Sequence, residues 1–405
     1  MKWISIFVIM AAITVGAVYF YIHPGDEQTN HSDHNTSMSG TLDVSSLVEE
    51  MSLDEKIGQM IVGGIDGTEL NNDTQDMIEN YHVGGVILFA DNIESKTQTT
   101  NLMNDIKKVN DNNPYPLLLG VDEEGGSVTR MPDEIISLPP SGSIGKEQDQ
   151  ELAFEVGTLL GKQMRGLGFN LDFAPVLDVN SNPDNPVIGE RSYGDDPHLV
   201  SEMGVQTMKG IENEGIISVV KHFPGHGDTS EDSHLELPKV DKSLKELSDL
   251  ELIPFENAIS EGADVVMIAH ILLPQIETEY PSSMSEDIIT GLLREDMGFD
   301  GVVISDDLTM GAITEDFRIE EAAIQSVKAG SDIVLIAHHP DAVTSVHKEL
   351  KAAVKNGDIN EERINESVER IIHLKRKYKL SNEETPQADF KLINEKVQEI
   401  LDKVS

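Results

Sequence analysis

Residues 216–234 read Ile216-Ile-Ser-Val-Val-Lys-His-Phe-Pro-Gly-His-Gly-Asp-Thr-Ser-Glu-Asp-Ser-His234, an apolar run followed at once by a polar loop. Pro224, Gly225 and Gly227 cannot continue a helix or a central strand, so the apolar run is predicted to be a strand that ends there. From Lys221 onward, a lysine, three histidines and two aspartates fall within fourteen residues. Titratable groups crowded at one strand end are typical of an active site.

The same alternation of a short apolar run and an amphipathic, helix-length segment recurs along the chain from residue 42. This alternation predicts parallel βαβ units. We expect eight strands, namely Gln59–Gly63, Gly85–Phe89, Leu117–Val121, Asn170–Leu177, Ile216–His222, Asp264–His270, Gly301–Ser305 and Ile333–Ala337.

The helical patterns fall between these strands and after the last of them. They are Thr74–Tyr81, Gln150–Gly166, Leu199–Glu214, Lys245–Ser260, Glu286–Met297, Glu320–Ala329, Asp341–Lys355 and Asn360–Lys379, with a charged helix at the C-terminus. Eight strand-helix units, with no glycine-rich dinucleotide turn and no Walker sequence, favour an α/β fold of the (β/α)8 TIM-barrel class over an open doubly wound sheet.

The other predicted strands also end in polar residues. In a barrel of this class, function sits where the strands end. Carboxylates together with Arg and Lys, and without a phosphate loop, favour a neutral, hydroxyl-rich ligand such as a sugar. The strand-end groups are Asp122-Glu-Glu-Gly-Gly126 with Arg130, Asp178 with the loop 185–194, His270, and Asp306-Asp307.

The amino-acid composition of the chain excludes further classes of partner and chemistry. Seventy-three acidic against thirty basic residues give a formal charge of −43, which would repel nucleic-acid phosphates, so no nucleic-acid partner is expected. Such a charge is also suited to a surface in high salt, where counterions screen the self-repulsion. The chain has no cysteine, which excludes disulfides, thiolate metal sites and a cysteine nucleophile.

The N-terminus carries Lys2 and then an uncharged run from Trp3 to Ile22, long enough to cross a hydrocarbon layer. The sequence thus predicts a signal peptide or transmembrane anchor at 1–23, a flexible polar linker at 24–41, a barrel domain at 42–380 and a helical tail at 381–405. Lys2 before the run and acidic residues after it place the rest of the chain outside, either membrane-anchored through this segment alone or secreted.

Four motifs together resemble the β-N-acetylhexosaminidase branch of glycoside hydrolase family 3, over roughly residues 45–380. They are Lys221-His-Phe-Pro-Gly-His-Gly-Asp-Thr with Asp232-Ser-His234, Gly120-Val-Asp-Glu-Glu-Gly-Gly126, Val187-Ile-Gly-Glu-Arg-Ser-Tyr-Gly194 and Ser305-Asp-Asp-Leu-Thr-Met310. The resemblance implies a TIM-barrel enzyme without a cofactor, expected to be a monomer, that removes terminal N-acetylglucosamine from peptidoglycan-derived muropeptides or related glycans.

The resemblance also implies the catalytic residues. Asp306 matches the family's nucleophile, a carboxylate that attacks the anomeric carbon and gives net retention. Asp307, its neighbour, is expected to cap a helix or to make a supporting contact. His234 matches the proton carrier and Asp232 the carboxylate that orients it, a pairing that suits an imidazole because its pKa lies near neutrality.

Further positions match the residues that bind the terminal sugar, where carboxylates accept from hydroxyls and cations donate to them. Met310 is expected to line the floor of the pocket. The chain departs from many relatives at Ser127, which stands where they have an arginine. The matching binding positions are Asp122, Arg130, Arg191, Lys221 and His222.

Other functions remain open on the residues alone. Within the same family, the chain could be a β-glycosidase or a phosphorylase that acts on another N-acetylhexosaminide. A metal-dependent hydrolase would use His222, His226, His234, His270 and Asp306, but it leaves the aspartate, lysine and arginine set unexplained. A glycan-binding module without activity is disfavoured because Asp306 and the Asp232/His234 pair are both present.

Overall fold

The computed structural model describes residues 43–233 and 235–404. The predicted anchor at 1–23, the predicted linker, the barrel boundary predicted at 42, and His234 lie outside these residues. None of the described helices is long and apolar enough to cross a membrane.

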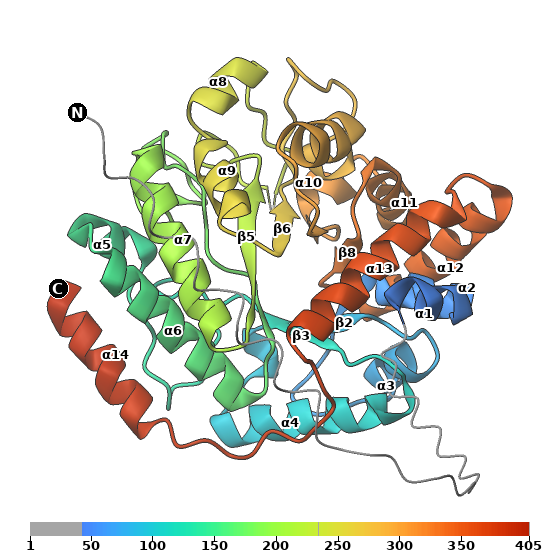
Figure 1. The fold of residues 1–405 in the computed structure, drawn as a ribbon, viewed down its shortest axis with the longest axis horizontal. Coiled ribbons are helices and arrows are strands. Elements are labelled where there is room, and N and C mark those ends of the chain that lie inside the picture. Colours follow the sequence, from blue (N-terminus) through green and yellow to red (C-terminus); the bar gives the residue numbers. More distant parts are fainter. Residues whose placement is uncertain (1–42, 234, 405) are drawn as a thin grey trace, which may run out of the picture. The chain divides into compact units, whose positions relative to one another are not determined.

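Eight parallel strands close into a barrel in which each strand pairs with the next and β1 pairs with β8 (Figure 1). All eight lie within two residues of where the sequence predicts them to begin, and the predicted fold class is confirmed. The strands are β1 Ile61–Gly64, β2 Gly85–Leu88, β3 Leu118–Val121, β4 Leu171–Asp172, β5 Ile217–Phe223, β6 Val265–Ile268, β7 Val302–Asp307 and β8 Ile333–Ile336.

Helices surround the strands (Figure 1). They are α1 Val44–Glu50, α2 Leu53–Gln59, α3 Asn72–Glu79, α4 Lys96–Val109, α5 Ser141–Glu147, α6 Gln150–Leu167, α7 Pro197–Asn213, α8 Leu244–Asp249, α9 Ile253–Ser260, α10 Gly311–Thr314, α11 Ile319–Ala329, α12 Pro340–Asn356, α13 Glu361–Lys377 and α14 Lys391–Val404. Short 3₁₀ turns and a π-type helix, η5 Asp287–Asp296, complete the connections.

Two predicted elements differ from the structure. The single helix expected over Lys245–Ser260 is instead the pair α8 and α9, because Leu250 leaves the helical region and Pro254 fits only the first turn of a new helix. The strand expected over Asn170–Leu177 pairs regularly only at Leu171–Asp172, and a single bridge joins Val176 to Lys221. Pro175 lies between these two pairings and has no N–H to donate.

Strands β5 and β7 each carry an irregularity near their C-terminal ends. The register of β5 against β6 shifts between Val220 and Phe223, and that of β7 against β8 shifts between Ile304 and Asp307. Such bulges re-aim side chains and occur often beside active sites. They fall at Lys221–His222 and at Asp306, which are the positions predicted to be functional.

The opposite, N-terminal end of the barrel is held by a buried ion cluster around Asp332, whose exposed fraction is zero. One of its carboxylate oxygens accepts from Arg294 and from the backbone N–H of Val303, at 2.7 and 2.9 Å. The other accepts from Arg363, Arg370 and Ser367. The cluster ties the start of β8 to η5, β7 and α13.

We expect Asp332→Asn to lower the free energy of unfolding by about 3–5 kcal/mol, because three partly buried guanidinium groups lose the buried anion that they share. Chemical denaturation measures the change. Glu261→Gln, which removes an exposed pair with Lys209, is the matched control and should cost at most about 1 kcal/mol. Equal effects of the two substitutions would show that the Asp332 cluster contributes no more than a surface pair.

Candidate active site

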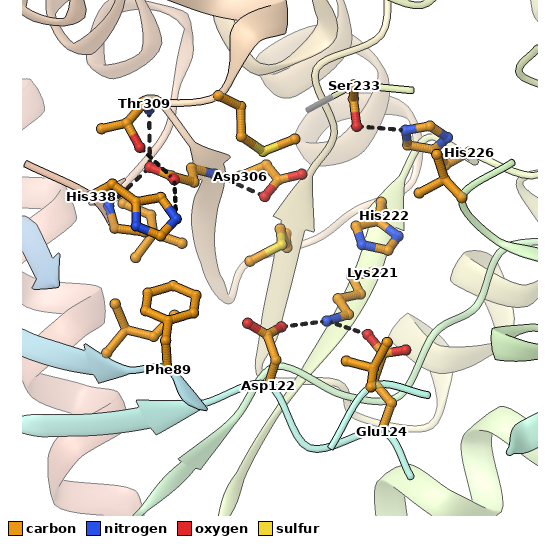
Figure 2. Close-up of a pocket in the computed structure, with 18 of the residues that line it drawn as sticks. Phe89, Asp122, Glu124, Lys221, His222, His226, Ser233, Asp306, Thr309 and His338 are labelled. Carbon is orange, nitrogen blue, oxygen red and sulfur yellow. Dashed lines mark hydrogen bonds and ion pairs between the residues drawn. The ribbon is translucent and has the colours of Figure 1, made fainter. Parts of the chain in front are cut away.

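A cavity of about 310 Å³ opens at the C-terminal ends of the strands (Figure 2). Seven of the predicted site residues line it together, although they come from four different strand-end segments. These residues are Asp122, Arg130, Arg191, Lys221, His222, Asp306 and Met310.

Lys221 lies at the centre of the charged wall of the cavity. Its side chain is 2% exposed, and its ammonium group contacts Asp122 Oδ1 and Glu124 Oε1, each at 2.7 Å (Figure 2). Burial alone would lower the pKa of Lys221, but the carboxylates of Asp122 and Glu124 raise it. The lysine is therefore a cation at neutral pH and holds the ends of β3 and β5 together.

Arg191 extends this network from the loop after β4. Its guanidinium group binds Glu124 through two parallel hydrogen bonds, from Nε and from NH2, both at 2.8 Å. Despite its burial, which opposes ionisation, Lys221 and Arg191 keep the pKa of Glu124 far below its usual range. Glu124 is thus a fixed anion that orients two cations, and the rigid fork of Arg191 suits this role.

His222 is held in one orientation from behind the cavity. Its Nδ1 lies 2.7 Å from Asp178 Oδ2, and Asp178 also accepts from the backbone N–H of His226 at 2.6 Å. Burial opposes the ionisation of Asp178, while the two imidazoles lower its pKa. The ring of His222 therefore presents Nε2 to the side of the cavity where Arg191 lies, at 3.5 Å.

Asp306 and Asp307 have different surroundings even though they are neighbours. Asp306 faces the cavity, and one of its oxygens accepts the backbone N–H of Asp307 at 2.8 Å (Figure 2). Asp307 instead accepts from the backbone and the hydroxyl of Thr309 and from the backbone N–H of Ala337. Its carboxylate thus joins the end of β7 to the end of β8, which matches the supporting contact predicted for it.

The surroundings also shift the pKa values of the two aspartates in opposite directions. Burial opposes the ionisation of Asp306, but His270 and His222 lower its pKa, so this carboxyl is an anion at neutral pH. Burial raises the pKa of Asp307. An ionised carboxylate that faces the cavity is what a nucleophile requires.

The loop after β5 returns to the cavity at Ser233. His226 contacts Ser233 Oγ through Nε2 at 3.2 Å and Thr229 Oγ1 through Nδ1 at 2.8 Å (Figure 2). Burial lowers the pKa of His226 to about 4, so this ring is neutral and structural. Asp232 lies just outside the lining, and its backbone oxygen accepts from the N–H of Leu235 and Glu236. His234 is outside the described residues.

Two glycines allow the close approaches that this site needs. Gly126 has φ +60°, and a Cβ there would lie 2.6 Å from Pro140 Cβ. A Cβ on Gly227 would lie 1.7 Å from Val179 O. The Gly125-Gly126 turn brings Arg130 to the cavity, whereas Ser127 at its tip is exposed and does not line it.

Sequence reasoning missed part of the lining. Phe89 and His338 stack at 4.8 Å between ring centroids on the side formed by β2 and β8 (Figure 2). Phe89 directly follows β2, and His338 lies two residues after the end of β8, so their nearness to strand ends is a signal that could have identified them. The remaining lining residues, to which the sequence reasoning assigned no sugar-binding or glycosidase role, are mostly apolar or small, and they are Ile87, Glu124, Val128, Val187, His226, Ser233, Met267, Asp307, Thr309, Gly311, Leu335 and Ala337.

The described imidazoles are not arranged as metal ligands. Over residues 43–233 and 235–404, no group of three or more His, Asp or Glu side chains is placed to hold a metal ion. His270 contacts Ser283 Oγ and Asp307 O through its two ring nitrogens, and His226 has both of its nitrogens in contact with hydroxyls.

Comparison with known proteins identifies the family of this chain. Residues 52–374 match the model of the glycosyl hydrolase family 3 N terminal domain. The chain is 34% identical over 337 residues to Beta-hexosaminidase A of Pseudoalteromonas piscicida, covering 76% of this chain and 56% of that protein. It is 37% identical over 285 residues to a Beta-hexosaminidase of Xylella fastidiosa strain M23, covering 69% of this chain and 83% of that protein.

A solved structure is also similar. A family 3 β-N-acetylglucosaminidase from Paenibacillus sp. strain FPU-7 superposes with a TM-score of 0.83 at 39% identity, covering 87% of this chain and 69% of that one. The barrel with carboxylates, lysine and arginine at its mouth is thus that of a glycoside hydrolase. The chain belongs to glycoside hydrolase family 3.

We expect Lys221→Met to lower kcat/KM by about a hundredfold or more, because Asp122 and Glu124 then face each other without their shared cation. Steady-state kinetics measure the loss. Lys375→Met is the matched control, since Lys375 is a buried lysine that binds Gln59 and the backbone oxygen of Gly84 at the far end of the barrel. An equal loss in both variants would point to general destabilisation.

Proposed function

We propose that this protein is a retaining exo-β-N-acetylglucosaminidase. The observation that carries the proposal is the position of the Asp306 carboxyl group, which lines the same cavity as the Lys221, Asp122 and Arg191 network. Ligand cavities span roughly 300–1,000 Å³. At about 310 Å³ the cavity suits one terminal sugar ring rather than a longer stretch of glycan, which favours exo cleavage.

The network is suited to a neutral sugar. Lys221 and Arg191 each face a carboxylate, so the charges compensate one another and offer fixed donors and acceptors for hydroxyl groups. Asp122 accepts from sugar hydroxyls, while Lys221, His222, Arg191 and Arg130 donate to them. Orientation near the reacting carbon is the physical contribution of these groups.

In the proposed reaction Asp306 attacks the anomeric carbon, and the glycosidic oxygen leaves with a proton that a second residue, the proton carrier, delivers to it. The covalent glycosyl-enzyme is then hydrolysed by a water that loses its proton to the same carrier. Two inversions at one carbon give net retention of configuration.

The proton carrier is proposed to be His234, oriented by Asp232. The other lining carboxyls are already engaged: Asp122 and Glu124 hold Lys221, and Asp307 accepts from Thr309 and Ala337. Neutral His226 has hydroxyl contacts on both nitrogens. The polar loop that reaches the cavity at Ser233 therefore remains the best source of the proton, and Asp232 and His234 flank that residue.

We also propose muropeptides derived from peptidoglycan as the glycan and an exported position, anchored through residues 1–23 or secreted. Both rest on the resemblance and on the N-terminal pattern. Adaptation to high salt is proposed from the formal charge of −43. Transfer to phosphate instead of water is the second candidate chemistry, because Arg130 lines the cavity and forms no ion pair with a carboxylate within the described residues.

The first test is hydrolysis of a chromogenic N-acetyl-β-glucosaminide, with the matching β-glucoside as comparison, in the presence and absence of phosphate. We expect release of free N-acetylglucosamine. Asp306→Ala should lower kcat by on the order of 10⁴-fold or more, while Asp307→Asn keeps measurable turnover. Preference for the glucoside, or a sugar phosphate as the main product, would overturn this assignment.

A second test concerns His234. His234→Ala should slow substrates with poor leaving groups by on the order of 10²–10⁴-fold but activated aryl glycosides far less, because only the former need a delivered proton. With an activated substrate the covalent intermediate should accumulate, since deglycosylation needs the same base. Asp232→Ala should give a milder version. Equal losses for good and poor leaving groups would mean that His234 is not the proton carrier.

A further inference from the structure

Two aromatic side chains that line the cavity, Phe89 and His338, take no part in the mechanism above. Their rings stack with centroids 4.8 Å apart and an angle of 28° between the planes. Figure 2 shows the two rings on the opposite side of the view from His222 and Glu124, away from the charged network. Stacked rings form an apolar surface that suits a ring-shaped part of a ligand.

The ring of Phe89 has a fixed base. Its side chain is partly buried and packs against the hydrophobic core. The backbone N–H of Phe89 donates to Asn92 Oδ1 at 2.8 Å, and the side-chain amide of the buried Asn92 donates to the backbone oxygens of Ile65 and Gly67. The loop after β1 therefore holds Phe89 in place before a ligand binds.

His338 is held from two sides and still faces solvent. Its ring stacks on Phe89, and its Nε2 lies 3.9 Å from Asp307 Oδ2. Asp307 is in turn held by hydrogen bonds from Thr309 and from Ala337, which precedes His338. The His338 side chain is 61% exposed, whereas every other described residue that lines the cavity is buried or half-buried. His338 therefore lies at the opening of the cavity.

The opening is where the second unit of a substrate has to lie. At about 310 Å³ the cavity suits one terminal ring, so the unit that follows the glycosidic oxygen extends past the opening. His338 contacts Asp307, the neighbour of Asp306, so the stacked pair lies close to the carbon that Asp306 would attack. A ring in the leaving group would thus meet the surface formed by Phe89 and His338.

We propose that Phe89 and His338 form the contact surface for the first unit of the leaving group. The protein then prefers substrates in which this unit is a ring, such as a second pyranose, over substrates with an acyclic leaving group. A pyranose face carries mainly C–H groups, which pack well on the electron-rich face of an aromatic ring. This assignment rests on the proposed function, and it makes the two residues determinants of specificity and not catalytic residues.

The test compares two substrates that share the terminal sugar. The β-linked dimer of N-acetylglucosamine has a pyranose leaving group, and methyl N-acetyl-β-glucosaminide has a leaving group without a ring. Both leaving groups are alcohols that need a proton, so a defect in proton transfer would slow both substrates. A defect in the ring contact would slow the dimer alone. The measured quantity is the ratio of kcat/KM for the dimer to kcat/KM for the methyl glycoside.

We expect His338→Ala and Phe89→Leu each to lower this ratio by about three- to tenfold, the size of one lost aromatic contact. His338→Phe keeps a ring in the same place and should keep the ratio. His339→Asn is the matched control and should also keep it, because His339 is the exposed neighbour and does not line the cavity. Asparagine tolerates the φ of +61° at this position.

A binding measurement separates this proposal from the proposed function. In Asp306→Ala, titration calorimetry should show that the dimer binds about three- to tenfold more tightly than N-acetylglucosamine alone. Adding His338→Ala to Asp306→Ala should remove that gain. Equal affinities of the two sugars for Asp306→Ala would overturn the contact surface. Cleavage of neither substrate by the unchanged protein would instead contradict the proposed function, and the binding comparison would still decide the role of the stacked pair.

Three kinetic results would also overturn the proposal. Equal losses for the two substrates in His338→Ala would mean that His338 acts on the site as a whole, through Asp307. An unchanged ratio in that variant would show that no ring of the leaving group rests on the pair. A ratio lowered as much by His338→Phe as by His338→Ala would show that the imidazole nitrogens, and not the stacked ring, carry the preference.

Discussion

The site depends on the buried ammonium group of Lys221. It compensates Asp122 and Glu124 at once, each at 2.7 Å, and without it these two carboxylates, which both follow β3, would repel each other. Arg191 closes the network from the loop after β4. The interaction is strong because water is almost excluded from it. It also orients hydrogen-bond donors and acceptors toward the sugar site before a sugar binds.

The barrel supplies this arrangement through its strand ends. Register shifts in β5 and β7 fall at the positions that turn Lys221 and Asp306 toward the cavity. Asp307 ties β7 to β8 and so keeps the neighbouring Asp306, the proposed nucleophile, in place. At the other end, Asp332 and three arginines hold the strands independently of the site, which separates stability from chemistry as expected for this fold.

Much of the fold and part of the site could be predicted from the sequence, because buried parallel strands read as short apolar runs and function follows their ends. The break between α8 and α9 was missed because the apolar periodicity continues through Leu250, where the backbone leaves the helix, although Pro254 is a signal of a new helix start. Glu124 and Glu123 look alike in sequence, yet the carboxyl group of Glu124 binds Lys221 and Arg191, whereas that of Glu123 accepts from Thr129 and from the backbone of Arg130. Phe89 and His338 meet only because closure of the barrel brings β2 and β8 to the same cavity.

The proposed mechanism requires that Asp306 form a covalent bond with the sugar, and peptide mapping by mass spectrometry after trapping with a slow fluorinated N-acetylglucosaminide detects that bond directly. We expect a single added sugar on the peptide that contains Asp306, with fragmentation placing it on that residue and no label in Asp306→Ala. A label on Asp307 or on a carboxyl elsewhere in the chain would contradict the mechanism.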